Sequence, residues 1–114
     1  MRTLAIAATL AAIAFPAAAH HGWAGYDEKT LVTIKAKVEE PRYANPHGEL
    51  YLTQGKRRWH VILAPVTRME ARGMNEADLE PGTTVTVEGY QNTSDANELR
   101  AERIIVNGKT VELR

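Results

Sequence analysis

Val32-Thr33-Ile34-Lys35-Ala36-Lys37-Val38 alternates apolar and polar side chains without interruption. Successive side chains of a β-strand point to opposite faces, so this period of two predicts a strand with one buried and one exposed face. The expected strand covers residues 31–39. Pro41 is expected to end it, because proline has no N–H to donate to a neighbouring strand.

The same period of two recurs in five further segments, residues 49–53, 57–63, 83–90, 99–106 and 109–113. Gly55-Lys56 and Asn107-Gly108 have the composition of tight turns, and Asn-Gly is a strong signal for a two-residue hairpin. The apolar side chains on the inward parity of these strands form the predicted core. They are Val32, Ile34, Val38, Trp59, Val61, Leu63, Val85, Val87 and Ile105.

One segment has helical features. Thr67-Arg68-Met69-Glu70 has the spacing of a capping box, and Gly73 is a natural C-terminal stop, so a helix of about two turns is expected, with a second turn at residues 75–79. Five or six strands with one short helix predict an all-β fold. The leading prediction is a small five- to six-stranded OB-like β-barrel, named after the oligonucleotide/oligosaccharide-binding fold. A small β-sandwich is the second candidate.

The first residues predict export. Met1-Arg2 is a short basic start, residues 4–15 form an apolar run, and Pro16-Ala17-Ala18-Ala19 ends it with the small residues that signal peptidase recognises. We expect residues 1–19 to be a cleaved signal peptide, followed by a single OB-like domain at residues 20–114. The apolar run is shorter than the roughly 20 residues of a membrane span, so no membrane insertion is expected after cleavage. The predicted location is the bacterial periplasm, with full secretion left open.

Composition limits the function classes. The chain of 114 residues has 14 Lys and Arg against 14 Asp and Glu, and it contains no Cys. A near-neutral surface argues against a nucleic-acid partner, which requires a basic face. Without Cys, an oxidising compartment offers no disulfide, so core packing alone must hold the predicted domain together.

Several motifs resemble one family. They are His20-His21-Gly22-Trp23, Tyr26-Asp27, Asn45-Pro46-His47, Trp59, Arg72-Gly73-Met74, Leu79-x-Pro81-Gly82 and Val85-x-Val87-x-Gly89-Tyr90. Together they look like a family of small exported bacterial proteins classed as a domain of unknown function, with His-His after the signal peptide and Asn-Pro-His before the second strand. The resemblance covers essentially the whole mature chain and implies an OB-like barrel in the periplasm. It implies no activity, and His60 is not part of its pattern.

The predicted cleavage after Ala19 makes His20 the N-terminal residue, which then offers two nitrogen ligands, its α-amine and its imidazole. These two nitrogens can chelate copper in one ring. A second histidine can add a third nitrogen in a T-shaped arrangement that is called a histidine brace. Nitrogen ligands of this kind suit copper. We predict copper as the cofactor, held by His20 and His47, with His21 as an alternative ligand. His47 is favoured because Pro46 and Gly48 frame it in a loop. A loop histidine that only makes hydrogen bonds is the alternative.

A second cleavage position also leaves a terminus that can bind copper. A cut after Ala18 would make His21 the third residue, which binds Cu(II) through the amine, two amides and the imidazole. Pro16 would then stand at the −3 position, which signal peptidase disfavours, so the cut after Ala19 is preferred.

The remaining side chains carry weaker signals. His60 has the outward parity of its strand and is expected to be solvated. Ser94 is the only serine, and cysteine is absent, so no catalytic residues are predicted. A copper enzyme is the least favoured class, because the mature chain is too small for the broad flat substrate surface of copper oxygenases. Met69 and Met74 are expected to pack in the core. Three aromatic residues are expected either to pack or to line a ligand surface, namely Trp23, Tyr26 and Tyr43.

The predicted function is a periplasmic copper-binding protein that acts in storage, delivery or protection. Its predicted partners are the metal ion and another periplasmic protein. The alternative is a metal-free exported OB-fold module that binds a sugar, a peptide or an envelope partner. Copper binding by the mature protein distinguishes the two.

Overall fold

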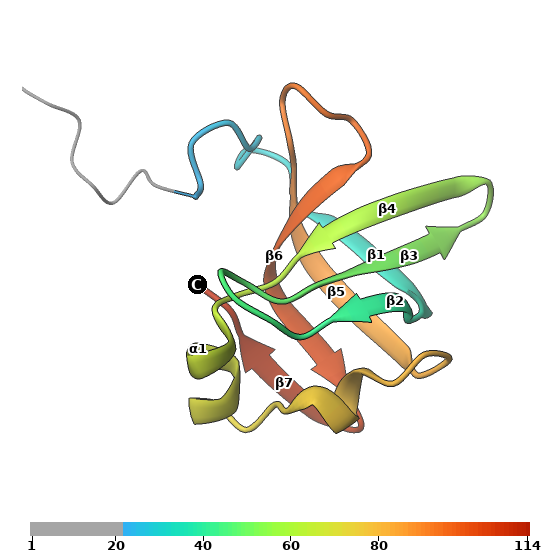
Figure 1. The fold of residues 1–114 in the computed structure, drawn as a ribbon. Helices are drawn as coiled ribbons and strands as arrows, with labels where there is room; N and C mark the ends of the chain where they lie inside the picture. Colours follow the sequence, from blue (N-terminus) through green and yellow to red (C-terminus); the bar gives the residue numbers. More distant parts are fainter. Residues whose placement is uncertain (1–21) are drawn as a thin grey trace, which may run out of the picture.

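The computed structural model describes residues 22–114. Seven strands and one α-helix make up this part of the chain (Figure 1). In chain order they are β1 (Val32–Lys37), β2 (Glu39–Arg42), β3 (Glu49–Gln54), β4 (Arg57–Ile62), α1 (Val66–Ala71), a 3-10 helix (Glu76–Leu79), β5 (Thr84–Gln91), β6 (Glu98–Val106) and β7 (Lys109–Glu112). The predicted all-β class with one short helix is therefore confirmed.

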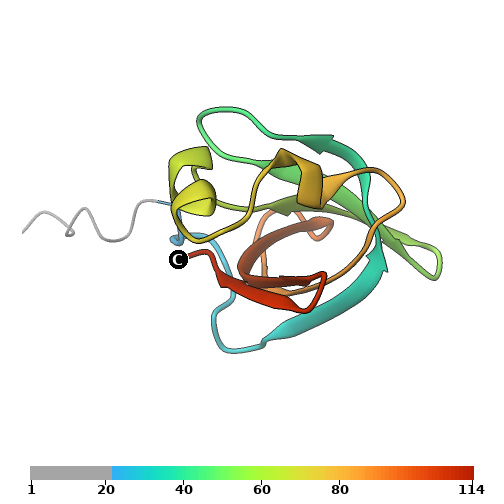
Figure 2. The same cartoon turned by 90° about the horizontal axis from the view of Figure 1, so that it is seen from below.

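All strands belong to one sheet in the order β1-β5-β6-β4-β3-β2, with β7 paired to β6. The pairing of β4 with β6 is parallel, and the other pairings are antiparallel. The two ends of this order, β1 and β2, are consecutive in the chain and separated only by Val38. The sheet curls so that they approach each other, as the end-on view in Figure 2 shows, but its hydrogen bonds do not close it into a barrel.

The predicted strands are all present, and β2 is the additional one. Pro41 does not end the first strand, because β2 is an edge strand on which a missing N–H costs no pairing. Instead the chain bends before it, where Glu40 adopts a positive φ of 43°. The expected strand of residues 31–39 is divided at Val38 into β1 and the start of β2.

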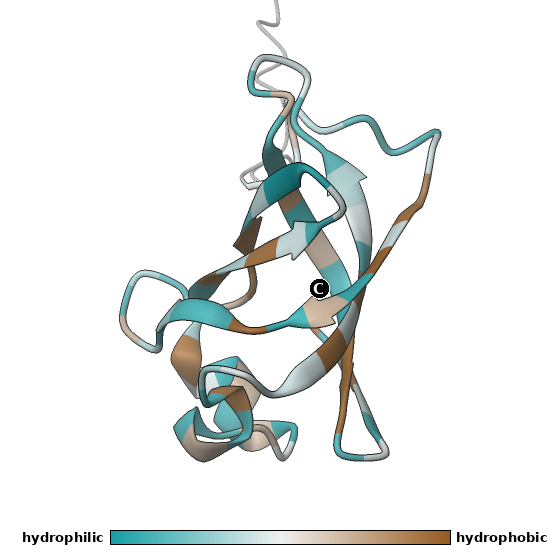
Figure 3. Ribbon diagram, turned by 90° about the vertical axis from the view of Figure 1, so that its right-hand side faces the viewer, coloured by the Kyte–Doolittle hydropathy of each residue, from teal (hydrophilic) through white to brown (hydrophobic). Residues whose placement is uncertain are grey.

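Figure 3 shows apolar and polar residues alternating along the strands. The predicted core residues are buried, or half-buried against the core for Val32, with one exception. Ile105 faces outward, and its neighbours Ile104 and Val106 are buried in its place.

A bulge in β6 explains this error of one residue. Gly89 pairs with Ala101 and Glu88 pairs with Arg103, so Glu102 is an extra residue that reverses the inward parity. Gly89 makes the bulge sterically feasible, because a Cβ there would collide with the carbonyl oxygen of Arg100. A strict period of two cannot predict such an insertion.

The helical region covers one end of the curled sheet (Figure 2). The helix α1 begins two residues earlier than the predicted capping box requires, because its N-cap is Pro65 instead of Thr67. Thr67 therefore lies in the first turn of the helix. The predicted second turn is the 3-10 helix, where the Asn75 N–H donates to the Asp78 carboxylate at 3.0 Å. Met69 and Met74 are fully buried in the core, as predicted. Within residues 22–114, no helix has the length and apolar character needed to cross a membrane.

Trp59 is 4% exposed, and the Arg57 guanidinium covers its ring at 3.6 Å from the centroid. Trp59→Ala should lower the free energy of unfolding by about 3–5 kcal/mol, because it leaves a large cavity in the core. His47→Ala, in a partly exposed loop, should change it by only about 0.5 kcal/mol. Urea unfolding of the two variants beside the parent checks this, and an equal loss in both would contradict it.

Candidate functional site

The loop between β2 and β3 holds His47 in place. The Gly48 N–H donates to the Ala64 carbonyl at 2.8 Å, and the Leu63 N–H donates back to the Gly48 carbonyl at 2.9 Å. Gly48 is buried, and a Cβ there would come within 2.5 Å of the Met69 side chain. The loop is therefore fastened to the end of β4 and to α1, which fixes the backbone of the neighbouring His47.

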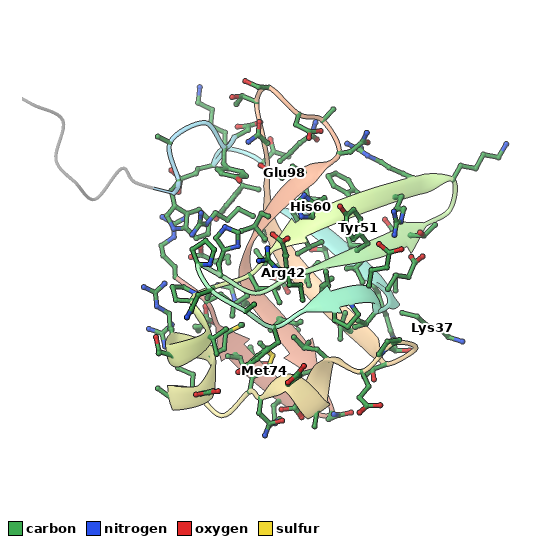
Figure 4. All side chains as sticks on the ribbon, in the orientation of Figure 1. Lys37, Arg42, Tyr51, His60, Met74 and Glu98 are labelled. Carbon is green, nitrogen blue, oxygen red and sulfur yellow. The ribbon has the colours of Figure 1, made fainter. Side chains whose placement is uncertain are left out.

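His60 lies on the outward face of β4, as its parity predicts, but it is not simply solvated. Its side chain is 27% exposed, and its ring stacks on Tyr51 with centroids 4.8 Å apart and an interplanar angle of 16°. Figure 4 shows His60 between Tyr51 and Glu98. These three residues occupy one row across the sheet, because His60 pairs with Tyr51 of β3 and with Glu98 of β6.

Two histidines converge on the carboxylate of Glu49. Its Oε2 lies 3.7 Å from His47 Nδ1 and 3.5 Å from His60 Nε2. Both distances exceed the usual range of about 2.7–3.2 Å for an N–H···O hydrogen bond. Both nitrogens are buried and have no hydrogen-bond partner among residues 22–114. Two imidazole nitrogens thus face the same oxygen of Glu49, but neither is close enough to form a hydrogen bond with it.

Glu98 is fixed by two donors. The Tyr26 hydroxyl donates to Glu98 Oε2 at 2.6 Å, and Asn92 Nδ2 donates to the same oxygen at 2.7 Å. The other oxygen, Oε1, lies 3.9 Å from His60 Nδ1. His60 therefore has a carboxylate beside each of its ring nitrogens.

Trp23 fastens the start of the described chain to this side of the sheet. Two guanidinium groups contact its ring, that of Arg100 at 4.9 Å from the ring centroid and that of Arg114 at 3.8 Å. Arg114 also pairs with Glu28 at 2.6 Å and with Glu102 at 2.8 Å.

Gly22 packs directly on the Arg100 guanidinium, where a Cβ would come within 2.7 Å of Nη1. Burial lowers the pKa of Arg100, and its Nε is a third buried atom for which the described residues supply no hydrogen-bond partner. Arg100 is the next outward residue after Glu98 on β6 and pairs with Ile62, which is 5% exposed. Residue 22 thus lies on the same outward face as His60.

Only part of the predicted site can be placed. His47 belongs to the polar cluster described above, which consists of Tyr26, His47, Glu49, His60 and Glu98. The other predicted ligands, His20 and His21, lie outside the described residues. Among residues 22–114, no three His, Asp or Glu side chains are arranged to hold a metal ion together. The described cluster is therefore at most one part of a metal site.

The sequence reasoning missed His60 as a member, and it missed Glu49 and Glu98 altogether. It named Tyr26 only as an aromatic residue of the core or of a ligand surface. Outward parity on β3 and β4 could have suggested Glu49 beside His60. The position of Glu98 depends on the pairing of β4 with β6, which no local pattern encodes.

Burial, and then the hydrogen bond to Glu98, raise the pKa of Tyr26 to about 12 from 10.0. The fold favours the protonated phenol, so Tyr26 contributes its full stabilisation below pH 10 and loses it as the pH rises through about 12. Tyr26→Phe lacks this group, so its free energy of unfolding should fall less than that of the parent across this window. Urea unfolding below and above the window checks this, and parallel losses in both proteins would count against it.

A protein-family model described as a family of unknown function (DUF6152) matches residues 7–100. No curated protein matches the chain. The family match extends over most of the chain, from the N-terminal apolar run to Arg100 in β6. The chain belongs to the DUF6152 family, a family of unknown function.

Proposed function

We propose that this protein is a periplasmic copper-binding protein that acts in storage, delivery or protection of the metal. Export and cleavage after Ala19 would expose the amine and imidazole of His20, and His47 would add the remote nitrogen, with His21 as an alternative. One observation carries the proposal. His47 Nδ1 is buried beside the Glu49 carboxylate at 3.7 Å and has no hydrogen-bond partner within residues 22–114.

A buried nitrogen without a partner costs free energy unless something binds to it. Imidazole and amine nitrogens are donors that suit copper, and Cu(II) has the highest affinity for such sites among the divalent first-row metals. The nearby Glu49 carboxylate would offset part of the positive charge of a bound ion. The His47 environment therefore supports a nitrogen-rich copper site more than it supports a loop histidine that only makes hydrogen bonds.

The position of Gly22 supports a contribution from the N terminus. Gly22 packs on Arg100, whose strand neighbours on the same face are Ile62 and Glu98. His20 stands two residues before Gly22 in the sequence, so its nitrogens would have to reach this face. The His-His pair and the Asn-Pro-His motif, which we associate with the family, would then meet in one site.

The experiment compares two forms of the protein that differ at one end. The first is exported by a bacterial host and shown by mass spectrometry to begin at His20. The second carries one extra Met before His20, which keeps every side chain but moves the free amine out of the His20 chelate ring. The extension should raise the Kd for Cu(II) by about tenfold or more. Each factor of ten in Kd corresponds to about 1.4 kcal/mol of binding free energy. Competition with a chromogenic chelator measures the affinity, and thermal unfolding shows that the fold is unchanged.

His47→Ala should weaken Cu(II) binding further while leaving a weak terminal site, and Glu80→Gln, an exposed change outside the cluster, should leave it unchanged. Equal affinity with the free and the extended terminus would refute the brace. In that case the metal-free module that binds a sugar, a peptide or an envelope partner would be the better interpretation.

A further inference from the structure

The strand β7 has a single partner in the sheet. It pairs with β6 and lies off the path along which the other strands follow one another. The ends of that path, β1 and β2, approach each other in the curled sheet, whereas no described strand pairs with the outer side of β7 (Figure 2). An unpaired strand edge presents N–H and C=O groups that can take up a strand of another molecule. The protein can therefore associate through the outer edge of β7 unless something covers it.

Hydrogen bonds within the β6–β7 hairpin identify the backbone groups on that edge. The Leu113 N–H donates to the Glu102 carbonyl at 2.8 Å, so the N–H of residue 113 faces β6. Backbone groups along an antiparallel strand alternate between its two sides. Thr110 and Glu112 stand at the other parity, so their N–H and C=O groups are directed to the outer edge.

Two arginines of the helical region reach the end of this edge. Nη1 of Arg72, the C-cap of α1, donates to the Glu112 carbonyl at 2.7 Å and to the Arg114 carbonyl at 3.0 Å. Arg68 lies four residues earlier, on the same side of α1, and donates to the Leu113 carbonyl at 2.9 Å. Figure 1 shows α1 beside this end of β7. Three consecutive carbonyls are thus occupied by guanidinium groups.

The start of β7 is fastened to the same helical region. The Lys109 ammonium donates to the Gly73 carbonyl at 2.9 Å and to the Asp78 carboxylate at 3.1 Å. Gly73 follows α1, and Asp78 belongs to the 3-10 helix, so both helical turns are tied to β7. Covering an edge with a helix or loop is one way in which sheet proteins avoid edge-to-edge association.

We propose that Arg68 and Arg72 form an edge guard, which keeps β7 from pairing with β7 of a second copy of this chain. Two identical edges can pair antiparallel about a two-fold axis. With Val111 of both copies at the axis, Thr110 of one copy would lie opposite Glu112 of the other, and both direct their backbone groups to the edge. The guard occupies the Glu112 carbonyl, which is an acceptor that this pairing requires. The inference is independent of the proposed copper site.

The test compares the exported protein with the double variant Arg68→Met/Arg72→Met, which keeps two long side chains on α1 but removes every donor. Sedimentation velocity is measured over a concentration series with a chelator present, so that no metal links two molecules. The parent should remain monomeric, and the double variant should form a species with the mass of two chains as the concentration rises. Hydrogen exchange should show the Thr110 and Glu112 amides protected in that species.

Two further variants make the result specific. Arg58→Met also replaces an exposed arginine, which pairs with Glu40 on another part of the sheet, and it should stay monomeric. Adding Thr110→Pro to the double variant removes an edge N–H without touching the pairing with β6, so it should restore the monomer.

Three outcomes would overturn the edge guard. They are a folded double variant that stays monomeric at every concentration, a dimer that persists with Thr110→Pro, and a parent that is itself a dimer with the Thr110 amide protected. Thermal unfolding establishes that each variant is folded. If the double variant does not fold, the single Arg72→Met, which retains the bond from Arg68, undergoes the same test and should show a smaller dimer fraction.

Discussion

The parallel pairing of β4 with β6 is the constraint on which the rest of the structure depends. Consecutive strands can pair through a tight turn, but parallel strands need a longer connection, and here the chain passes through α1, the 3-10 helix and β5 before it returns as β6. This pairing joins the β3–β4 hairpin to the β5–β6 hairpin. It also sets His60 directly opposite Glu98, so one backbone register determines both the core and the outward row of polar residues.

The two faces of the central strands have separate roles. Val61 and Leu99 face inward and are fully buried, and their neighbours His60 and Glu98 face outward. A change of one residue in register would exchange these sets, so the apolar face that stabilises the fold also fixes the position of the polar cluster. The bulge at Glu102 reverses the parity of β6 beyond Ala101, and it leaves Glu98 and Arg100 on the outward face.

Segments outside the sheet complete the outward face. The loop before β3 supplies His47, the loop after β5 supplies Asn92, and the segment before β1 supplies Tyr26. Each of these segments is held by backbone hydrogen bonds, as in the pairing of Tyr26 with Asn92 and the bond from the Asp27 N–H to the Gln91 carbonyl at 2.9 Å. Because these loops are anchored to a rigid sheet, side chains that are distant in sequence can hold defined positions relative to one another.

The sequence by itself determined the all-β class, the strand segments and the Asn107-Gly108 turn, because these follow from local periodicity and turn chemistry. It placed almost all of the predicted core residues on the correct face. It also singled out His47 from its Pro-Gly frame. The exceptions were Ile105, which a bulge displaces, and Pro41, which an edge strand tolerates. Only the tertiary structure decided that Glu98 lies beside His60, since this proximity depends on a parallel pairing between strands far apart in the chain. Periodicity specifies which face a side chain occupies, but strand order specifies its neighbours on that face.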